Sequence, residues 1–433
     1  MGTSATGKYE RRPASGIGGL AALLFAVAGP AAAQDIGTEL RGFVHDDAVA
    51  TIHIRSFFLD RTNPQPPNNA AWAGGGWLGY ESGWLFGVLK AGAVGYTSQP
   101  LWAPPSTDGT LLLQPGQYGY WVLGQAYGSI KIADQIFTGY RQIIDELEVN
   151  PQDDRMTPNT FEAYALRGAI GRVGYFAGYV SKMKQRNDSD FHDMAAVAGA
   201  PASVTAGMWL GSVKYRPIDT LTLRASTYLV PDILTSGYGD VAWSAPMPEG
   251  IKFRLSSNLM VQGSNGADLL TGTAFSTWSA GGKAALSWGD ATISAAYMQT
   301  GSAAPYRTPY GAWIGYGKQI TKDFDRANER AFQIGAAYDF AGVRLPGLTF
   351  SGSATMGNGA IDPTTGASLI NNSEYDLDLQ YSLTADIWPD CLKPLALRGR
   401  AAWIDQNQNG QLSATTEYRL ILNYEWKFKS GGR

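Results

Sequence analysis

Basic side chains recur at the centres of segments in which every second residue is apolar. Arg55 follows Ile54, and Arg254 stands between Phe253 and Leu255. A guanidinium group donates two parallel hydrogen bonds to a carboxylate, so a row of such groups could bind and guide organic anions. Rows of Arg or Lys around a pore also favour anions over cations. The residues in this pattern are Arg55, Lys131, Arg167, Arg224, Arg254, Arg398, Arg400 and Arg419.

Acidic residues share the polar face of the later segments. Glu374, Asp376 and Asp378 alternate with apolar residues, as do Glu417 and Glu425. A row of bases facing a patch of acids would produce a field across a lumen, and that field would orient a solute carrying a carboxylate and a cationic or polar group. In the alternative interpretation, the charges only hydrate the lumen and pair with one another. The pattern leaves both interpretations open.

The elements that carry these charges are expected to be long strands. In residues 417–428 one parity is apolar or aromatic from Tyr418 to Phe428, and the other is polar except for Ile421. Side chains alternate across a strand, so the segment has one apolar and one polar face. It is also about twice the usual strand length. The apolar face would line the core of a soluble sandwich, or meet lipid in an outer-membrane barrel.

About 18 such segments recur, separated by turn residues, and an even number places both chain ends on the periplasmic side. Connections alternate between short turns and long loops, as in a bacterial barrel, and no propeller repeat is found. The sequence therefore predicts an all-β, transmembrane, antiparallel up-and-down β-barrel. The predicted strands are 50–60, 71–81, 84–98, 119–133, 135–141, 161–169, 172–184, 203–215, 220–229, 238–246, 251–262, 276–288, 291–300, 329–341, 348–357, 373–386, 395–406 and 414–428.

The first 33 residues are typical of a secretory signal peptide. A basic start with Lys8, Arg11 and Arg12 precedes a short apolar stretch and three alanines before Gln34. We expect residues 34–433 to form one barrel domain in the outer membrane, in contact with lipid and lipopolysaccharide. The net charge of −3 gives no reason to expect a nucleic-acid partner.

Residues suited to catalysis or metal binding are scarce. The chain has a single cysteine, Cys391, and three histidines, with no zinc-ligand spacing and no GxSxG motif. A nucleophile needs a base within reach, so we expect no enzyme, cofactor or metal site. A barrel lipase or protease remains a remote alternative.

Several segments together resemble the OprD-type outer-membrane porins, the specific carboxylate channels of pseudomonads and relatives. The resemblance covers nearly the whole mature chain and depends on the order and spacing of its parts. These are 54–61 (IRSFFLDR), 139–142 (GYRQ), 154–161 (DRMTPNTF), 338–340 (YDF), 345–350 (LPGLTF), 397–400 (LRGR) and 417–424 (EYRLILNY).

This resemblance implies an 18-stranded barrel with a pore in each monomer and a third loop, residues 142–160, folded inwards as a constriction. Uptake of small carboxylate-bearing solutes, such as basic amino acids or aromatic and aliphatic acids, would follow. A trimer and handling by the outer-membrane assembly machinery are further expectations, although the chain ends in 429–433 (KSGGR) instead of a terminal aromatic residue. By position, the ladder would include Arg55, Arg398, Arg400 and Arg419, and the constriction Arg141, Asp154 and Arg155, with Tyr306 and Tyr310 from a later long loop.

Two transport functions remain open. In a substrate-selective channel, the bases attract the carboxylate weakly enough for release, while Asp154, Asp376 and Asp378 favour a solute that also carries positive charge. In a general, weakly selective porin, the same charges only hydrate the pore and do not discriminate among solutes.

Overall fold

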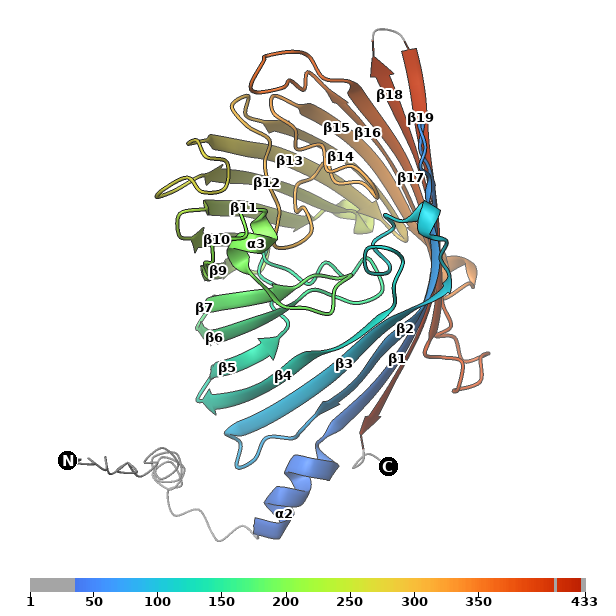
Figure 1. Ribbon diagram of the computed structural model, residues 1–433. Coiled ribbons are helices and arrows are strands. Elements are labelled where there is room, and N and C mark those ends of the chain that lie inside the picture. The colour runs from blue at the N-terminus through green and yellow to red at the C-terminus, as the bar shows by residue number, and fades with distance from the viewer. Residues whose placement is uncertain (1–35, 409–410, 430–433) are drawn as a thin grey trace, which may run out of the picture.

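The computed structural model describes residues 36–408 and 411–429, which form a closed antiparallel barrel (Figure 1). The described sheet has 19 strands, and all but the two-residue β8 (His192–Asp193) belong to the wall. β1 pairs with both β2 and β19, so the sheet closes on itself as an 18-strand barrel. The predicted fold class is therefore confirmed.

The wall strands are long and are joined mostly in sequence order. They are β1 (Val49–Thr62), β2 (Asn69–Glu81), β3 (Leu89–Trp102), β4 (Tyr120–Ile132), β5 (Gln135–Gln142), β6 (Thr160–Ile170), β7 (Val173–Lys184), β9 (Met208–Ile218), β10 (Leu221–Val230), β11 (Leu234–Pro246), β12 (Lys252–Gly263), β13 (Ser276–Trp288), β14 (Ala291–Thr300), β15 (Arg330–Asp339), β16 (Leu348–Asn358), β17 (Asn371–Ser382), β18 (Leu395–Gln408) and β19 (Gln411–Lys429).

The described helices are short. They are α2 (Ile36–Arg41), the π-helix η1 (Gly42–Asp46), α3 (Met194–Ala198) and the 3-10 helices η2 (Pro105–Thr107), η3 (Pro248–Gly250) and η4 (Phe340–Val343). Over the described part of the chain, no helix has the length and apolar character needed to cross a membrane. The predicted signal peptide, residues 1–33, lies outside the described residues.

Every predicted strand corresponds to a wall strand, with two notable errors in the boundaries. The strand predicted at 84–98 begins only at Leu89, because Phe86 and Gly87 adopt positive φ angles and form a turn. The strand predicted at 203–215 begins at Met208, since the preceding residues belong to the loop after β7. Apolar residues in a turn or a packed loop imitate the alternation of a strand.

The wall has the two faces that the sequence predicts. On β12, Leu255, Leu259 and Val261 are about half exposed, whereas Asn258 and Met260 between them are buried. The apolar parity of the strands therefore faces outwards, and the polar parity faces the lumen. Most connections at the rim where β1 begins and β19 ends are short turns, with a longer one at 383–394 between β17 and β18, and most long loops leave the opposite rim (Figure 1).

Candidate functional site

The connection between β5 and β6, residues 143–159 and here called the third loop, crosses the interior of the barrel. Its Asp153 accepts a hydrogen bond of 2.6 Å from Arg55 on β1, and its Glu148 accepts one of 2.8 Å from Ser236 on β11. These two strands lie on opposite sides of the ring. A loop bonded to both must pass through the lumen, and Figure 1 shows chain segments lying inside the ring of strands.

Arg55 fixes one end of the third loop. Its side chain donates from Nη1 to Asp153 Oδ1 at 2.6 Å and to the Arg155 carbonyl oxygen at 2.5 Å. Its Nε donates to Asn423 on the neighbouring strand at 2.7 Å. The residue is only 7% exposed, so the predicted ladder residue acts mainly as a covered anchor for the loop.

Asp154 and Arg155, both predicted at the constriction, are bound to groups in neighbouring loops. Asp154 pairs with Arg186 of the loop after β7, and Arg155 donates from Nε to the Thr110 carbonyl oxygen at 2.9 Å. Burial favours the neutral form of Asp154, but the charges of Arg155 and Arg186 outweigh it and hold the pKa of Asp154 below its usual value. Burial lowers the pKa of Arg155 to about 9, and Asp154 opposes this shift. The third loop is thus held by a chain of opposite charges.

The connection between β14 and β15, residues 301–329 and here called the seventh loop, packs on the third loop. Asn150 donates to the Tyr310 carbonyl oxygen at 3.2 Å, and Tyr306 donates its hydroxyl to Glu148 at 2.5 Å. The Tyr310 hydroxyl donates to the Met194 carbonyl oxygen at 2.8 Å. Tyr306 and Tyr310 are 2% and 0% exposed, so these predicted constriction residues shape the loop layer by packing.

Glu148 joins the two loops to the wall through hydroxyl groups, and it forms no ion pair with any residue that the structure describes. It accepts hydrogen bonds from Ser236 and Tyr306, and burial raises the pKa of its carboxyl group. The hydroxyl donors partly oppose that shift because they stabilise the charged form. This contact is therefore sensitive to the protonation state of one buried group.

A second part of the seventh loop lies along β17 and β19. The backbone N–H groups of Thr321 and Lys322 both donate to Glu374 at 2.7 Å, and the Ile320 N–H donates to Asp376 at 2.7 Å. Arg419 donates to the Ile320 carbonyl oxygen at 3.1 Å. Three acidic and basic wall residues thus hold backbone groups of the loop.

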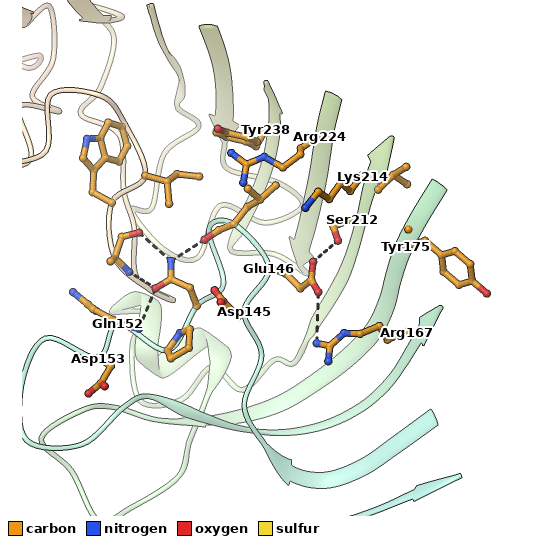
Figure 2. A pocket seen from close by; sticks show the side chains of 18 of the residues that line it. Asp145, Glu146, Gln152, Asp153, Arg167, Tyr175, Ser212, Lys214, Arg224 and Tyr238 are labelled. Carbon is orange, nitrogen blue, oxygen red and sulfur yellow. Dashed lines mark hydrogen bonds and ion pairs between the residues drawn. The ribbon is translucent and has the colours of Figure 1, made fainter. Parts of the chain in front are cut away.

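A cavity of about 830 Å³ lies between the third loop, the seventh loop and strands β6 to β11. Figure 2 shows Arg167, Lys214 and Arg224 pointing from neighbouring strands into this space, with Glu146 of the third loop facing them. Arg167 lies 3.6 Å from Glu146, and Ser212 donates to Glu146 at 2.5 Å. Arg224 is paired with Asp240 on β11. Within the described chain Lys214 forms no ion pair.

A second cavity of about 320 Å³ lies beside β13 to β18. Small wall residues leave the space open, and Lys283, Asp376, Asp378 and Arg400 supply its charges. Lys318 of the seventh loop lines both cavities. Partial desolvation inside the loop layer lowers the pKa of its ammonium group. The wall residues that create the space are Ala285, Thr292, Ser294, Gly335, Ser351, Gly352 and Ser353.

The remaining predicted residues lie at separate places on the wall. Arg398 and Arg400 share Asp378, which Arg400 contacts at 2.9 Å. Arg141 donates to Glu162 at 3.0 Å and lies on β5 rather than in the third loop. Its guanidinium lies 4.1 Å from the centre of the Phe191 ring. The predicted set is thus divided among loop anchors, paired wall charges and cavity-lining charges.

Lys131 and Arg254 are exposed and touch neither the third nor the seventh loop through an ion pair in the described part of the chain. Lys131 lies 5.8 Å from the centre of the Trp84 ring, near the rim with the short turns. Among the residues that the structure describes, no group of His, Cys, Asp and Glu could hold a metal ion.

Sequence reasoning missed three residues that define this site: Arg186, Lys214 and Lys318. Lys214 stands between Val213 and Tyr215 on a wall strand, and this alternation of apolar and charged residues was a usable signal in the sequence. Arg186 and Lys318 lie in long loops without periodicity, where the sequence gives no direction for a side chain. Their roles follow only from the way the loops fold into the lumen.

A closed barrel with an apolar exterior, a charged lumen and loops folded inside has the architecture of a membrane porin. The family model described as "outer membrane porin, OprD family" matches residues 41–428. The chain therefore belongs to the OprD family, and it is an integral β-barrel of the outer membrane. The resemblance noted in the sequence is confirmed.

Solved structures support the fold. The structure of OpdK from Pseudomonas aeruginosa with vanillate has a TM-score of 0.78 and 19% identity, and the match covers 89% of this chain and 100% of that one. OccK9 (OpdG) of the same species has a TM-score of 0.80 and 22% identity, with the same two coverages. Acinetobacter baumannii OccAB1 has a TM-score of 0.78 and 18% identity, covering 89% and 98%. No curated protein matches the chain.

Proposed function

We propose that the protein is a substrate-selective diffusion channel for small solutes bearing a carboxylate. The observation that carries the proposal is the set of bases around two adjoining cavities: Arg167, Lys214 and Arg224 beside one, Lys283 and Arg400 beside the other, and Lys318 lining both. A carboxylate could pass from one base to the next without leaving positive potential. Weak attraction at several successive sites permits release as well as entry.

The second cavity favours a solute that also carries a cationic or hydrogen-bond-donating group. Asp376 and Asp378 line this cavity beside Arg400. A cationic or hydrogen-bond-donating group on the solute could interact with these acids while its carboxylate faces the base. An amino acid or a hydroxy acid has both groups. OpdK, which shares this fold, has been solved with the aromatic acid vanillate.

A general, weakly selective porin is the second candidate, and it also has a specific observation in its favour. Arg224 is already paired with Asp240, and Arg398 and Arg400 share Asp378. Ion pairs closed within the protein attract a passing anion less than free bases do. The two functions differ in whether the remaining bases discriminate among solutes of equal size.

Solute flux into vesicles distinguishes the two candidates. We expect benzoate and arginine to enter faster than uncharged solutes of similar size. The double variant Lys214→Gln with Lys318→Gln, which removes two cavity-lining bases that form no ion pair among the described residues, should reduce this preference, whereas neutral-solute flux should not fall. Equal rates for all solutes, or an unchanged preference in the double variant, would support the general porin.

We also propose that each monomer encloses its own pore, because one chain closes the barrel. Assembly as a trimer remains a prediction, and light scattering of the detergent-solubilised protein tests it. An enzymatic role is not part of the proposal. A purified sample that hydrolyses phospholipid would contradict this view.

A further inference from the structure

The first described segment, residues 36–46, carries an apolar stripe that the channel function does not use. α2 and η1 form a continuous helical segment, in which Ile36, Leu40 and Val44 are spaced by four residues. Residues four apart lie on one face of a helix. Their exposures are 65%, 47% and 56%, so this face is not covered by the described part of the barrel. Thr38 lies on the opposite face.

Polar and backbone groups fix the segment to the rim where β1 begins and β19 ends, the rim that faces the periplasm in bacterial barrels. The Glu39 carboxylate accepts a hydrogen bond of 3.1 Å from the Phe86 N–H in the turn between β2 and β3. The Phe43 carbonyl oxygen accepts one of 2.9 Å from the Gly83 N–H in the same turn. A Cβ atom at Gly83 would lie 2.7 Å from the Gly42 carbonyl oxygen, so the turn and the segment pack closely. The apolar stripe is therefore held at a defined place.

That place adjoins the lipid-facing belt of the barrel. Tyr80, on the outward face of β2, donates its hydroxyl to the Val44 carbonyl oxygen at 2.8 Å. Outward-facing Leu78 on β2 and Trp426 on β19 are 65% and 50% exposed. The β1 register places Tyr80 and Phe428 opposite Ala50, at the end of the wall where the helical segment joins β1. Aromatic residues in such positions mark the membrane interface.

We propose that residues 36–46 lie on the periplasmic leaflet of the outer membrane as an interfacial anchor, with Ile36, Leu40 and Val44 in contact with lipid. The apolar stripe continues the surface that already meets lipid, which favours lipid over a soluble partner. A helix this short binds a bilayer weakly on its own. Here the covalent link to the barrel supplies a high effective concentration, so modest apolar burial suffices. The anchor would fix the barrel's depth and tilt at the β1–β2 side.

Site-specific fluorescence quenching tests this proposal on the full mature chain. Cys391 is the only cysteine, so Cys391→Ser provides a background in which Leu40→Cys carries an environment-sensitive label. Thr38→Cys is the matched control on the polar face. The labelled proteins are reconstituted in phosphatidylethanolamine and phosphatidylglycerol vesicles at fewer than one protein per vesicle. Nitroxide-bearing lipid and aqueous iodide serve as the two quenchers, and heat-modifiable migration on gels confirms folding.

We expect nitroxide lipid to quench the Leu40 label several-fold more than the Thr38 label, and iodide to show the opposite order. Equal iodide quenching at the two positions would place the stripe in water and overturn the proposal. Protection of the Leu40 label from both quenchers would mean that protein covers it, which also overturns the proposal. If Leu40→Cys fails to fold, Val44→Cys provides the same test from the next turn.

Discussion

Two parts of the lumen wall carry similar charges but use them differently. At β19 and β1, Arg55 and Arg419 are 7% and 2% exposed and hold backbone groups of the third and seventh loops. At β13 to β18, Lys283 and Arg400 border a cavity that small wall residues leave open. A base on the lumen side of a strand can therefore anchor a loop or line a cavity, and its role depends on whether a loop packs against it.

The difference follows from what covers each wall. Phe57 and Leu59 on β1 also point inwards. They are buried against Met156 of the third loop and against Leu112 and Leu113 of the connection between β3 and β4. Apolar residues on the lumen side give the loops a surface on which to pack. Strands β13 to β16 offer Ala, Ser and Gly there, which bury little apolar area and leave room for a solute.

Arg55→Ala should have the largest effect, because it removes an anchor instead of a solute contact. Each charge-assisted hydrogen bond contributes roughly 1.5–3 kcal/mol. The contact of Arg55 with Asp153 lies at the lower end of this range, because the Asp153 side chain is partly exposed to solvent. We expect a more mobile third loop, a higher single-channel conductance and weaker solute discrimination, with the barrel intact. Single-channel recording and hydrogen exchange over residues 143–159 measure these changes.

Arg254→Ala is the matched control for that variant. Arg254 is an exposed lumen base on β12 that forms no ion pair among the described residues. Its removal should change ion selectivity slightly and leave exchange in the third loop unaltered. If both variants gave the same conductance and the same exchange pattern, the distinction between loop anchors and cavity charges would be wrong.

Lys318→Gln should give the next largest effect. Unlike Arg55→Ala, it should weaken solute binding and leave the third loop in place. The side chain lines both cavities and holds no loop through a side-chain hydrogen bond in the described residues, so loop exchange should stay unchanged. Loss of one solute–charge contact of about 1.4 kcal/mol corresponds to tenfold weaker binding. Titration of benzoate block in planar bilayers measures it, and an unchanged block constant would remove Lys318 from the solute path.

The seventh loop should also respond to pH. Burial, reinforced by the neighbouring Asp323, raises the pKa of Asp325 from 3.8 to about 7. The folded loop thus holds a proton that the unfolded loop releases, so this group's contribution to loop stability falls as pH rises from about 4 to about 7. We expect faster hydrogen exchange in residues 319–327 at pH 7.5 than at pH 5, after correction for intrinsic rates. Burial also raises the pKa of Asp323, so Asp325→Asn should reduce this difference without abolishing it, and an unchanged difference would show that Asp325 does not contribute.

Tyr306→Phe should have the smallest effect. It removes the hydroxyl that Glu148 accepts at 2.5 Å and leaves Ser236 as the remaining donor. The expected cost is about 1 kcal/mol in the contact between the third and seventh loops. Local hydrogen exchange near residue 148 should rise modestly, with conductance nearly unchanged. A conductance increase as large as that of Arg55→Ala would contradict the ranking.

The sequence predicted the wall well because the period of a strand is local information. The parity that places Arg55, Arg400 and Arg419 in the lumen needs only their immediate neighbours. The contact of Arg419 with Ile320 joins residues 99 positions apart, and no local pattern encodes it. For the same reason the sequence could not give the partners of Asp376, one of whose oxygens accepts a hydrogen bond from the seventh loop.

The central claim is that cavity-lining bases select carboxylate solutes, and the zero-current potential across a planar bilayer under a salt gradient tests it most directly. The measurement is made in salt alone and then with benzoate or arginine added. We expect anion preference in salt and a carboxylate-dependent block that Lys318→Gln weakens. An unselective channel that neither solute blocks would contradict the claim and establish a general porin.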